Sequence, residues 1–203
     1  MSVAHALEVQ ALSQEAMDQL FFESRTINSF SGDPLTEEQM KQVYEAAKMP
    51  PTMMNAQPLR IDWLQSEEAR AKVAAHMGGS NGKKTLEAPT VAVLSYDVDF
   101  HEHLPFTFPH FAEAKDMFTE EGPRAERALE NAWMQAAYFI MAVRALGYSA
   151  GPMTGGDLAA ITDVLNEGTA HKAFMVVSIA QPGENPYFQR LPRFEFEQVN
   201  RVL

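Results

Sequence analysis

Residues 124–146 read RAERALENAWMQAAYFIMAVRAL and form the longest helical pattern of the chain. Its apolar side chains recur at helical spacing and cover most of the circumference of the helix that they predict. A helix that is apolar on nearly every side is buried among other elements, so we expect 124–146 to be the central helix of the domain. Gly147 follows it directly and is expected to end it, because glycine readily adopts the left-handed conformation of the residue after a helix.

Short strands are predicted on both sides of this helix. The runs 90–96 and 173–180 are apolar and rich in β-branched residues, which is the form of a buried central strand. Apolar and polar residues alternate over 59–64, and this alternation predicts a further strand. Because the strands do not alternate regularly with helices along the chain, the sequence predicts an α+β fold rather than a doubly wound sheet.

Four more helices are predicted, three of them with clear N-caps. Thr36 begins one with Gln39 as its capping-box partner, and Ser66 and Asp157 begin two others. The expected helices cover about 4–22, 36–49, 66–77 and 157–165. The segments 78–84 and 97–123 are predicted as loops, the first for its glycines and the second for its prolines and histidines.

The composition excludes several classes of protein. The chain has 203 residues, of which 27 are acidic and 16 basic, so its formal net charge is −11. This acidic balance argues against a nucleic-acid partner, and the absence of cysteine excludes disulfides, iron–sulfur ligation and a cysteine nucleophile. No apolar stretch approaches the ~20 residues of a membrane span, and the N-terminus lacks a signal-peptide pattern. We therefore expect a single cytoplasmic domain over 1–203 that binds neither nucleic acid nor membrane.

Three familiar motifs do not fit the sequence. The loop 78–84 first suggests a phosphate-binding P-loop, but its outer glycines are one residue too close and Lys84 stands where a hydroxyl is needed. A dinucleotide-binding fingerprint, G-x-G-x-x-G, follows a strand. The glycines of 147–155 are instead spaced by four and follow a predicted helix, so this fingerprint is excluded. No Gly-x-Ser-x-Gly elbow of a serine hydrolase is present. A nicotinamide cofactor would therefore bind without a Rossmann domain.

Residues 97–103 offer candidate metal ligands. In an extended segment Asp97, Asp99, His101 and His103 would share one face and could supply carboxylate and imidazole ligands. The competing interpretation is a polar, proline-rich loop with solvated histidines. No second ligand cluster supports a metal, so we expect none.

Polar residues in several separate segments suggest a different site. Ser24–Phe30 places a guanidinium beside a hydroxyl and an amide, a combination that can bind a phosphate or a ribityl chain. PTMMNAQP (51–58) joins a helix end to a strand and offers Thr52, Asn55 and Gln57 at close spacing. Each segment alone is readily explained as a polar loop. Together with GPMTGGD (151–157) and the late arginines Arg190 and Arg193, they form a recognisable pattern.

That pattern resembles the nitroreductase family of FMN-dependent enzymes. The matching segments run through nearly the whole chain and are RTINSF (25–30), PTMMNAQP (51–58), Asn81 with Lys84, NAWMQAAY (131–138) and the turn 147–155. KTLEAP (84–89), LPFTFPH (104–110), MQAAY (134–138), GPMTG (151–155) and RLPR (190–193) match the branch that contains malonic semialdehyde reductase and the NADH dehydrogenase/NAD(P)H nitroreductases. Leu59 replaces the usual aromatic residue and Thr154 replaces a common glutamate, which weakens the case for nitroaromatic specificity.

The resemblance implies a fold, a cofactor and a partner. Family members have a central, mostly antiparallel sheet flanked by helices, and form homodimers with FMN at the subunit interface. A C-terminal arm reaches the partner subunit. NADH or NADPH would donate hydride to flavin N5, and a small acceptor would then take it in a ping-pong cycle. Since the flavin carries the chemistry, no catalytic side chain is expected.

The resemblance also implies roles for individual residues. Arg25 and Arg190, with Arg193 as an alternative to Arg190, would bind the FMN phosphate. The other cofactor contacts would come from Thr26 and Asn28 at the ribityl or pyrimidine side, Asn81 and Lys84 at the pyrimidine edge, Pro152, Met153, Thr154 and Gly155 against the ring, and Thr52 and Asn55 of the partner subunit. His103, Phe108 and His110 are the expected acceptor contacts.

Three functions remain open from the sequence. The first is reduction of a small carbonyl compound such as malonic semialdehyde, or of an enone. The second is a nitroaromatic or quinone reductase of broad specificity. The third is a flavin-binding module without turnover.

Overall fold

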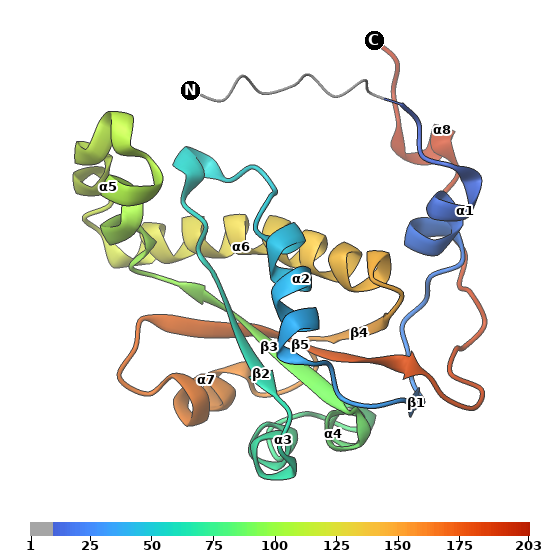
Figure 1. The fold of residues 1–203 in the computed structure, drawn as a ribbon. Helices are drawn as coiled ribbons and strands as arrows, with labels where there is room; N and C mark the ends of the chain where they lie inside the picture. The colour runs from blue at the N-terminus through green and yellow to red at the C-terminus, as the bar shows by residue number, and fades with distance from the viewer. Residues whose placement is uncertain (1–9) are drawn as a thin grey trace.

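An antiparallel sheet of five strands runs through the centre of the protein in the computed structural model, which describes residues 10–203 (Figure 1). β5 (His171–Pro182) is its central strand and pairs with β3 (Thr90–Asp97). β4 (Ser149–Met153) and the two-residue β1 (Phe30–Ser31) also pair with β5, while β2 (Leu59–Leu64) pairs with β3 and forms an outer edge. This arrangement confirms the α+β fold with an antiparallel sheet.

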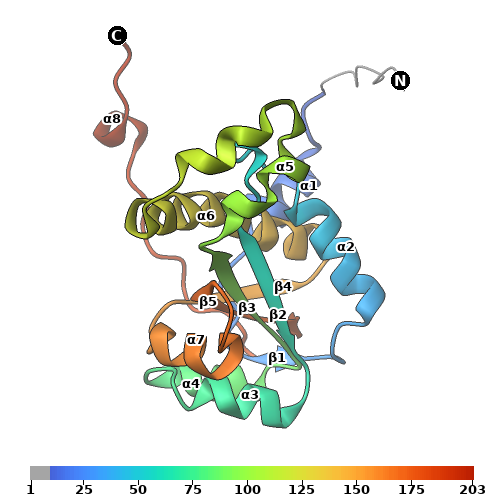
Figure 2. The same ribbon diagram turned by 90° about the vertical axis from the view of Figure 1, so that its left-hand side faces the viewer.

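Helices lie on both faces of this sheet (Figures 1 and 2). α2 (Glu37–Ala47) and the long α6 (Glu121–Ala145) pack against each other on one face. α3 (Glu67–Ala74), α4 (Ser80–Glu87) and α7 (Leu158–Asn166) gather at the other. The sheet is therefore buried between two helical layers, each with its own hydrophobic core.

Short elements complete the chain. The short α-helices are α1 (Gln14–Met17), α5 (Leu104–Thr107) and α8 (Phe196–Val199). The remaining turns are the π-helical η1 (Asp18–Phe22) and the 3-10 helices η2 (Met53–Asn55), η3 (Phe100–His103) and η4 (Pro109–Met117). After β5 the chain leaves the body of the molecule, and α8 stands apart from it (Figure 2).

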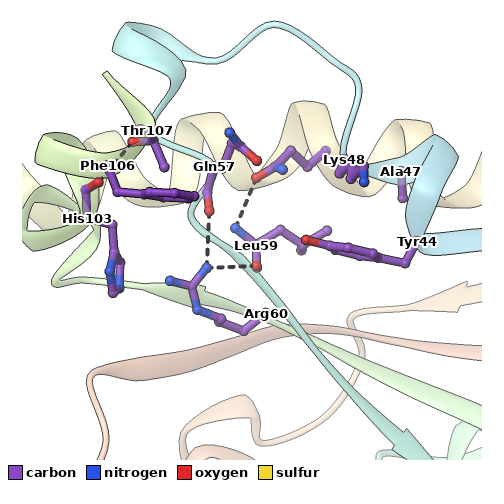
Figure 3. Close-up of a pocket in the computed structure, with 11 residues that line it drawn as sticks. Tyr44, Ala47, Lys48, Gln57, Leu59, Arg60, His103, Phe106 and Thr107 are labelled. Carbon is purple, nitrogen blue, oxygen red and sulfur yellow. Dashed lines mark hydrogen bonds between the residues drawn. The ribbon is translucent and has the colours of Figure 1, made fainter. Parts of the chain in front are cut away.

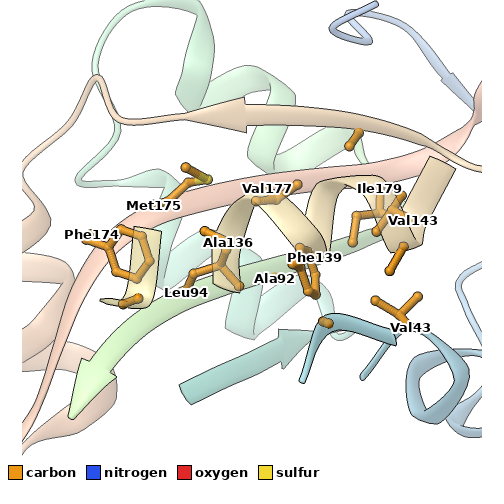
Figure 4. Packing of buried hydrophobic residues seen from close by; sticks show 14 of the residues in the cluster. Val43, Ala92, Leu94, Ala136, Phe139, Val143, Phe174, Met175, Val177 and Ile179 are labelled. Carbon is orange, nitrogen blue, oxygen red and sulfur yellow. The ribbon is translucent and has the colours of Figure 1, made fainter. Parts of the chain in front are cut away.

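α6 forms one side of the larger hydrophobic core (Figure 4). Phe139 is fully buried there, and its ring centroid lies 5.5 Å from that of Trp63 on β2. Ala136 and Val143 pack beside it against apolar side chains of β3 and β5. The prediction of a central helix at 124–146 is thus confirmed, with a start three residues earlier.

The prediction that this helix is buried on nearly every side is wrong for one face. Trp133, Met134 and Tyr138 are each more than 40% exposed. The ring of Trp133 packs edge-on against Phe174 of β5 on one side, with centroids 4.9 Å apart. The rest of this ring and the side chains of Met134 and Tyr138 leave an apolar face open in the single subunit.

The predicted helix boundaries hold where a polar cap sets them. The Thr36 hydroxyl accepts from the N–H of Gln39, whose side chain accepts from the N–H of Thr36, so the capping box is formed. Ser66 and Asp157 likewise accept from backbone N–H groups at the starts of α3 and α7. Gly147 has a φ of +81° and follows the end of α6, as expected.

Two elements differ from the predicted loops. Residues 80–87 form α4, although 78–84 was predicted as a loop, because Gly82 lets this helix approach α3 closely. A Cβ atom on Gly82 would lie 3.0 Å from the carbonyl oxygen of Ala74. The strand β4 was also missed, since Pro152 is unusual in a strand; β4 pairs only with β5, and proline is tolerated at such an edge.

Two further predictions need correction. Residues 97–123 are not an irregular loop but a series of short helical turns, η3, α5 and η4. The predicted helix over 4–22 begins only at Gln14 in the part of the chain that the structure describes, and its first residues lie outside that part. Within residues 10–203, no helix combines the length and apolar character needed to cross a membrane.

Replacing the central aromatic side chain tests the importance of the α6 core. Phe139→Ala is expected to lower the free energy of unfolding by about 3–5 kcal/mol, because it leaves a cavity in a closely packed core. Urea denaturation measures this change. Phe106→Ala is the matched control, since Phe106 is 88% exposed and its loss should change stability by less than about 0.5 kcal/mol. Equal effects of the two substitutions would contradict this description of the core.

Asp62 on β2 makes stability depend on pH. Burial raises the pKa of its carboxyl, which His171 only partly opposes, and its Oδ2 has no partner among the described residues. A raised folded-state pKa means that the native state loses stability as the pH rises through and above the usual value for aspartate. Asp62→Asn is therefore expected to stabilise the protein at pH 7, with a gain that shrinks toward pH 3. A gain independent of pH in thermal unfolding would refute this assignment.

Candidate functional site

Five cationic side chains line one cavity with a volume of about 420 Å³. The cavity lies where residues 24–28, α4, the end of α6 and the segment 188–193 meet. We call it the cationic cavity, and its cations are Arg25, Lys84, Arg144, Arg190 and Arg193. Thr26 and Asn28 also line it, so six of the predicted cofactor residues come together here.

Arginine side chains connect residues 22–25 with residues 188–190 around this cavity. Arg25 donates to the carbonyl of Phe188 at 3.4 Å, and Arg190 donates to the carbonyls of Phe22 and Ser24. The backbone N–H of Asn28 donates to Pro186 at 2.9 Å. These donors bind main-chain carbonyls, so none of these hydrogen bonds neutralises the positive charge of an arginine.

The cavity holds almost no negative charge. Glu23 approaches Arg25 at 4.0 Å, while no carboxylate of the described residues lies within 4.0 Å of the other four cations. Burial lowers the pKa of the Arg144 guanidinium, and the neighbouring Arg190 lowers it further. In a chain of net charge −11, such a concentration of cations is suited to binding an anion.

A polar turn adjoins the same end of α4. The Asn81 amide donates to the carbonyl of Gly155 at 3.1 Å, and the N–H of Gly78 donates to the same carbonyl at 2.9 Å. A Cβ atom on Gly155 would lie only 2.9 Å from the Asn81 amide nitrogen, so a larger residue there would displace the Asn81 side chain. Among the loop hydrogen bonds of the described residues, the N–H groups of Thr154 and Gly155 have no acceptor and are free to bind a ligand.

The two residues before this turn are placed differently from each other. Pro152 is half-buried in β4. The side chain of Met153 is buried in the second core beside α7, so only its main chain can face a ligand.

A second cavity, of about 230 Å³, lies between α2, the start of β2 and α5 (Figure 3). Gln57, Arg60, His103, Phe106 and Thr107 are among its lining residues. It shares no lining residue with the cationic cavity.

The predicted partner-side residues lie beside this second cavity. Asn55 donates to the carbonyl of Thr107 at 2.7 Å and accepts from the Gln57 amide at 2.9 Å, while Thr52 accepts from the N–H of Gln57. Met54, Asn55 and Gln57 all have positive φ, a conformation that these contacts must hold in place.

Asp97 is a buried carboxylate at the base of this region. Its oxygens bind the Arg60 guanidinium, His103 Nε2 at 3.2 Å and the N–H of Asp99 at 2.9 Å. The segment 100–103 is a 3-10 helix, so the extended arrangement that could have supplied metal ligands does not form. No group of three or more acidic or histidine side chains within residues 10–203 is placed to hold a metal ion.

The other two predicted acceptor contacts lie apart from both cavities. The rings of Phe108 and His110 contact each other at a tilt of 58°, with centroids 3.9 Å apart. Phe108 packs against the small core around Phe100, and His110 is exposed.

Arg144 is the one cation of the cavity that the sequence did not identify. It lies in the last turn of α6, within the run MAVRALG (141–147). A lone charge in an apolar stretch of a buried helix was the signal available, since such a charge requires a partner.

Anion binding tests the character of the cationic cavity. Phosphate is expected to raise the unfolding temperature of cofactor-free protein by about 2–4 °C over chloride at equal ionic strength, because it binds only the folded state. Arg190→Gln should reduce this shift. The control Arg127→Gln, which removes an exposed cation paired with Glu130, should preserve it. Identical shifts in all three proteins would argue against a specific anion site.

Comparison with known proteins identifies the family. The nitroreductase family model matches residues 23–180. A Streptomyces coelicolor protein provisionally named NADH dehydrogenase/NAD(P)H nitroreductase is 47% identical over 93% of this chain and 96% of its own length.

Solved structures agree on the fold. The Bacillus subtilis protein ydfN, described provisionally as a nitroreductase, superposes with a TM-score of 0.82 at 18% identity, over 94% of this chain and all of its own. A protein of Exiguobacterium sibiricum with the same provisional description, solved with FMN, gives 0.82 at 17% identity, over 96% of this chain and all of its own. From the matched family model and the identity with its relative, the chain belongs to the nitroreductase family.

Proposed function

We propose that this chain is an FMN-dependent NAD(P)H oxidoreductase that reduces a small carbonyl acceptor such as malonic semialdehyde in a ping-pong cycle. The observation that carries the proposal is the cationic cavity beside the Asn81–Gly155 turn. A phosphate-bearing flavin needs positive charge at one end and hydrogen-bond donors at its ring, and the described residues offer both.

The phosphate end of the cofactor fits the cationic cavity. Arg25 and Arg190 lie on opposite chain ends that meet there, and Arg193 is the alternative to Arg190. Arg190 is the better candidate because it donates to the segment before Arg25, whereas Arg193 donates only to carbonyls of Leu191 and Pro192. A phosphate dianion would supply the negative charge that this cavity lacks.

The remaining cofactor contacts follow from the same arrangement. Thr26 and Asn28 line the cavity and can bind the ribityl or pyrimidine side. Asn81 and Lys84 are three residues apart on α4 and therefore share a face toward the pyrimidine edge. There Lys84 would stabilise negative charge at N1–O2, and the free N–H of Thr154 or Gly155 would face N5.

The chemistry belongs to the cofactor, and the chain positions it. When bound, FMN would supply hydride transfer from NADH or NADPH to an acceptor. The residues of this chain bind the phosphate, fix the ring and place a cation at its pyrimidine edge. We propose no catalytic serine, cysteine or histidine.

A homodimer would bring the two separate cavities together. The exposed apolar face of α6, with Trp133, Met134 and Tyr138, provides a contact surface that the single subunit leaves open. Phe188, Phe194 and Phe196 of the C-terminal arm are also exposed, which suits an arm that packs on a partner. Thr52 and Asn55 would then contact the flavin of the partner subunit, and His103, Phe108 and His110 would lie toward the acceptor.

Comparison of acceptors tests the proposed reaction. The value of kcat/KM for malonic semialdehyde should exceed that for a nitroarene or a quinone by at least about tenfold, because a site built for a polar substrate disfavours analogues that lack its groups. A higher value for the nitroarene or quinone would favour a broad nitroreductase, the function in the relatives' names. Binding of FMN with no turnover of any acceptor would favour a flavin-binding module.

Mixed dimers test whether the site is shared. Arg25→Ala should impair the FMN site of its own subunit, and Asn55→Arg should block the site of the partner. A heterodimer of the two variants, co-expressed with different tags, would hold one intact site and one site with both changes. It should therefore regain about half of the wild-type activity. A heterodimer no more active than either variant would place Asn55 and Arg25 in the same subunit's site or outside it.

A further inference from the structure

Arg144 lies at the cationic cavity without an assigned role. It stands in the last turn of α6 (Glu121–Ala145), where a cation offsets the negative end of the helix dipole. That effect explains a positive charge at this position but does not explain why its side chain lines the cavity with Arg190.

Contacts at one end hold the guanidinium in place. Its Nη1 donates to the carbonyl of Leu20 at 3.0 Å and lies 3.7 Å from the sulfur of Met141. The Gln19 amide in turn donates to the main-chain carbonyl of Arg144 at 2.7 Å. Arg144 is therefore oriented before any ligand binds, which lowers the entropic cost of using it.

The other donors of the guanidinium are free. Nε and Nη2 of Arg144 donate to no atom of the described residues, and no carboxylate of those residues lies within 4.0 Å of the guanidinium. The side chain is half-buried and lies near Arg190, so burial and the like charge of Arg190 both disfavour its charged form. A partly buried cation that stays ionised and lacks a counter-ion is stabilised by an anion brought into the cavity.

We propose that Arg144 is a phosphate-binding residue whose free guanidinium donors contact the FMN phosphate beside Arg25 and Arg190. This inference rests on the proposed function, and it adds a consequence for specificity. Because riboflavin has no phosphate, Arg144 makes the protein select FMN over riboflavin. A residue that only supported α6 and the N-terminal segment would affect both flavins alike.

Flavin titration of cofactor-free, full-length protein tests the proposal. Fluorescence quenching gives the Kd of FMN and of riboflavin for the wild type, Arg144→Gln and Arg144→Lys. The glutamine keeps a hydrogen-bond donor on a shorter side chain but carries no charge. Its Kd for FMN should rise about 10- to 100-fold, the range for a lost hydrogen bond to a charged group, while its Kd for riboflavin changes less than about twofold. Arg144→Lys keeps the charge, so its Kd for FMN should lie between that of the wild type and that of Arg144→Gln.

Arg127→Gln is the matched control, because Arg127 is an exposed arginine of the same helix that pairs with Glu130. It should bind both flavins as the wild type does. If Arg144→Gln weakened the binding of both flavins equally, or left the Kd for FMN unchanged, the proposed role of Arg144 would be wrong. Failure of the wild type to bind FMN would instead overturn the proposed function, so the two failures are distinguishable. Circular dichroism of each variant confirms that the compared proteins are folded.

Discussion

The charge balance of the cationic cavity is the constraint on which the site depends. Five cations meet in one cavity of a chain whose net charge is −11, and one carboxylate, Glu23, comes within 4.0 Å of any of them. Positive charges that repel one another cost free energy in the cofactor-free protein. An anion that binds among them removes this cost, so the same arrangement that weakens the empty site strengthens the occupied one. We propose that the FMN phosphate is this anion, and that neutral groups mainly hold the ring.

The fold brings distant parts of the chain to this cavity. β4 and the short β1 both pair with β5, which places the segment before β1 near the end of α6 and the chain after β5. Arg25, Arg144 and Arg190 then fasten these segments through main-chain carbonyls rather than carboxylates. The hydrogen bonds fix the geometry and leave the charge for the ligand. The buried face of α6 provides the rigid support, and its exposed face is available for a second subunit.

Local chemistry made much of the fold predictable. Caps such as Thr36 and Asp157 and the apolar runs of β3 and β5 act over a few residues, so their consequences are readable from sequence. Elements that depend on distant partners were missed: α4 requires Gly82 against Ala74, and β4 requires β5 beside Pro152. The motifs identified Arg25, Lys84 and Arg190, which the structure brings together. They could not show that Asn55 and His103 lie at a separate cavity, because a sequence motif gives residue types and does not give the distances between them in the fold.

We propose that this chain holds FMN and uses it to transfer a hydride from a nicotinamide to an acceptor. An anaerobic titration of the purified, FMN-loaded protein tests it most directly. One equivalent of NADH or NADPH should bleach the visible flavin absorbance, and adding malonic semialdehyde should restore it with release of the reduced product. Protein that binds no FMN, or whose bound flavin is not bleached by either nicotinamide, would show that the chain is not an FMN-dependent NAD(P)H oxidoreductase.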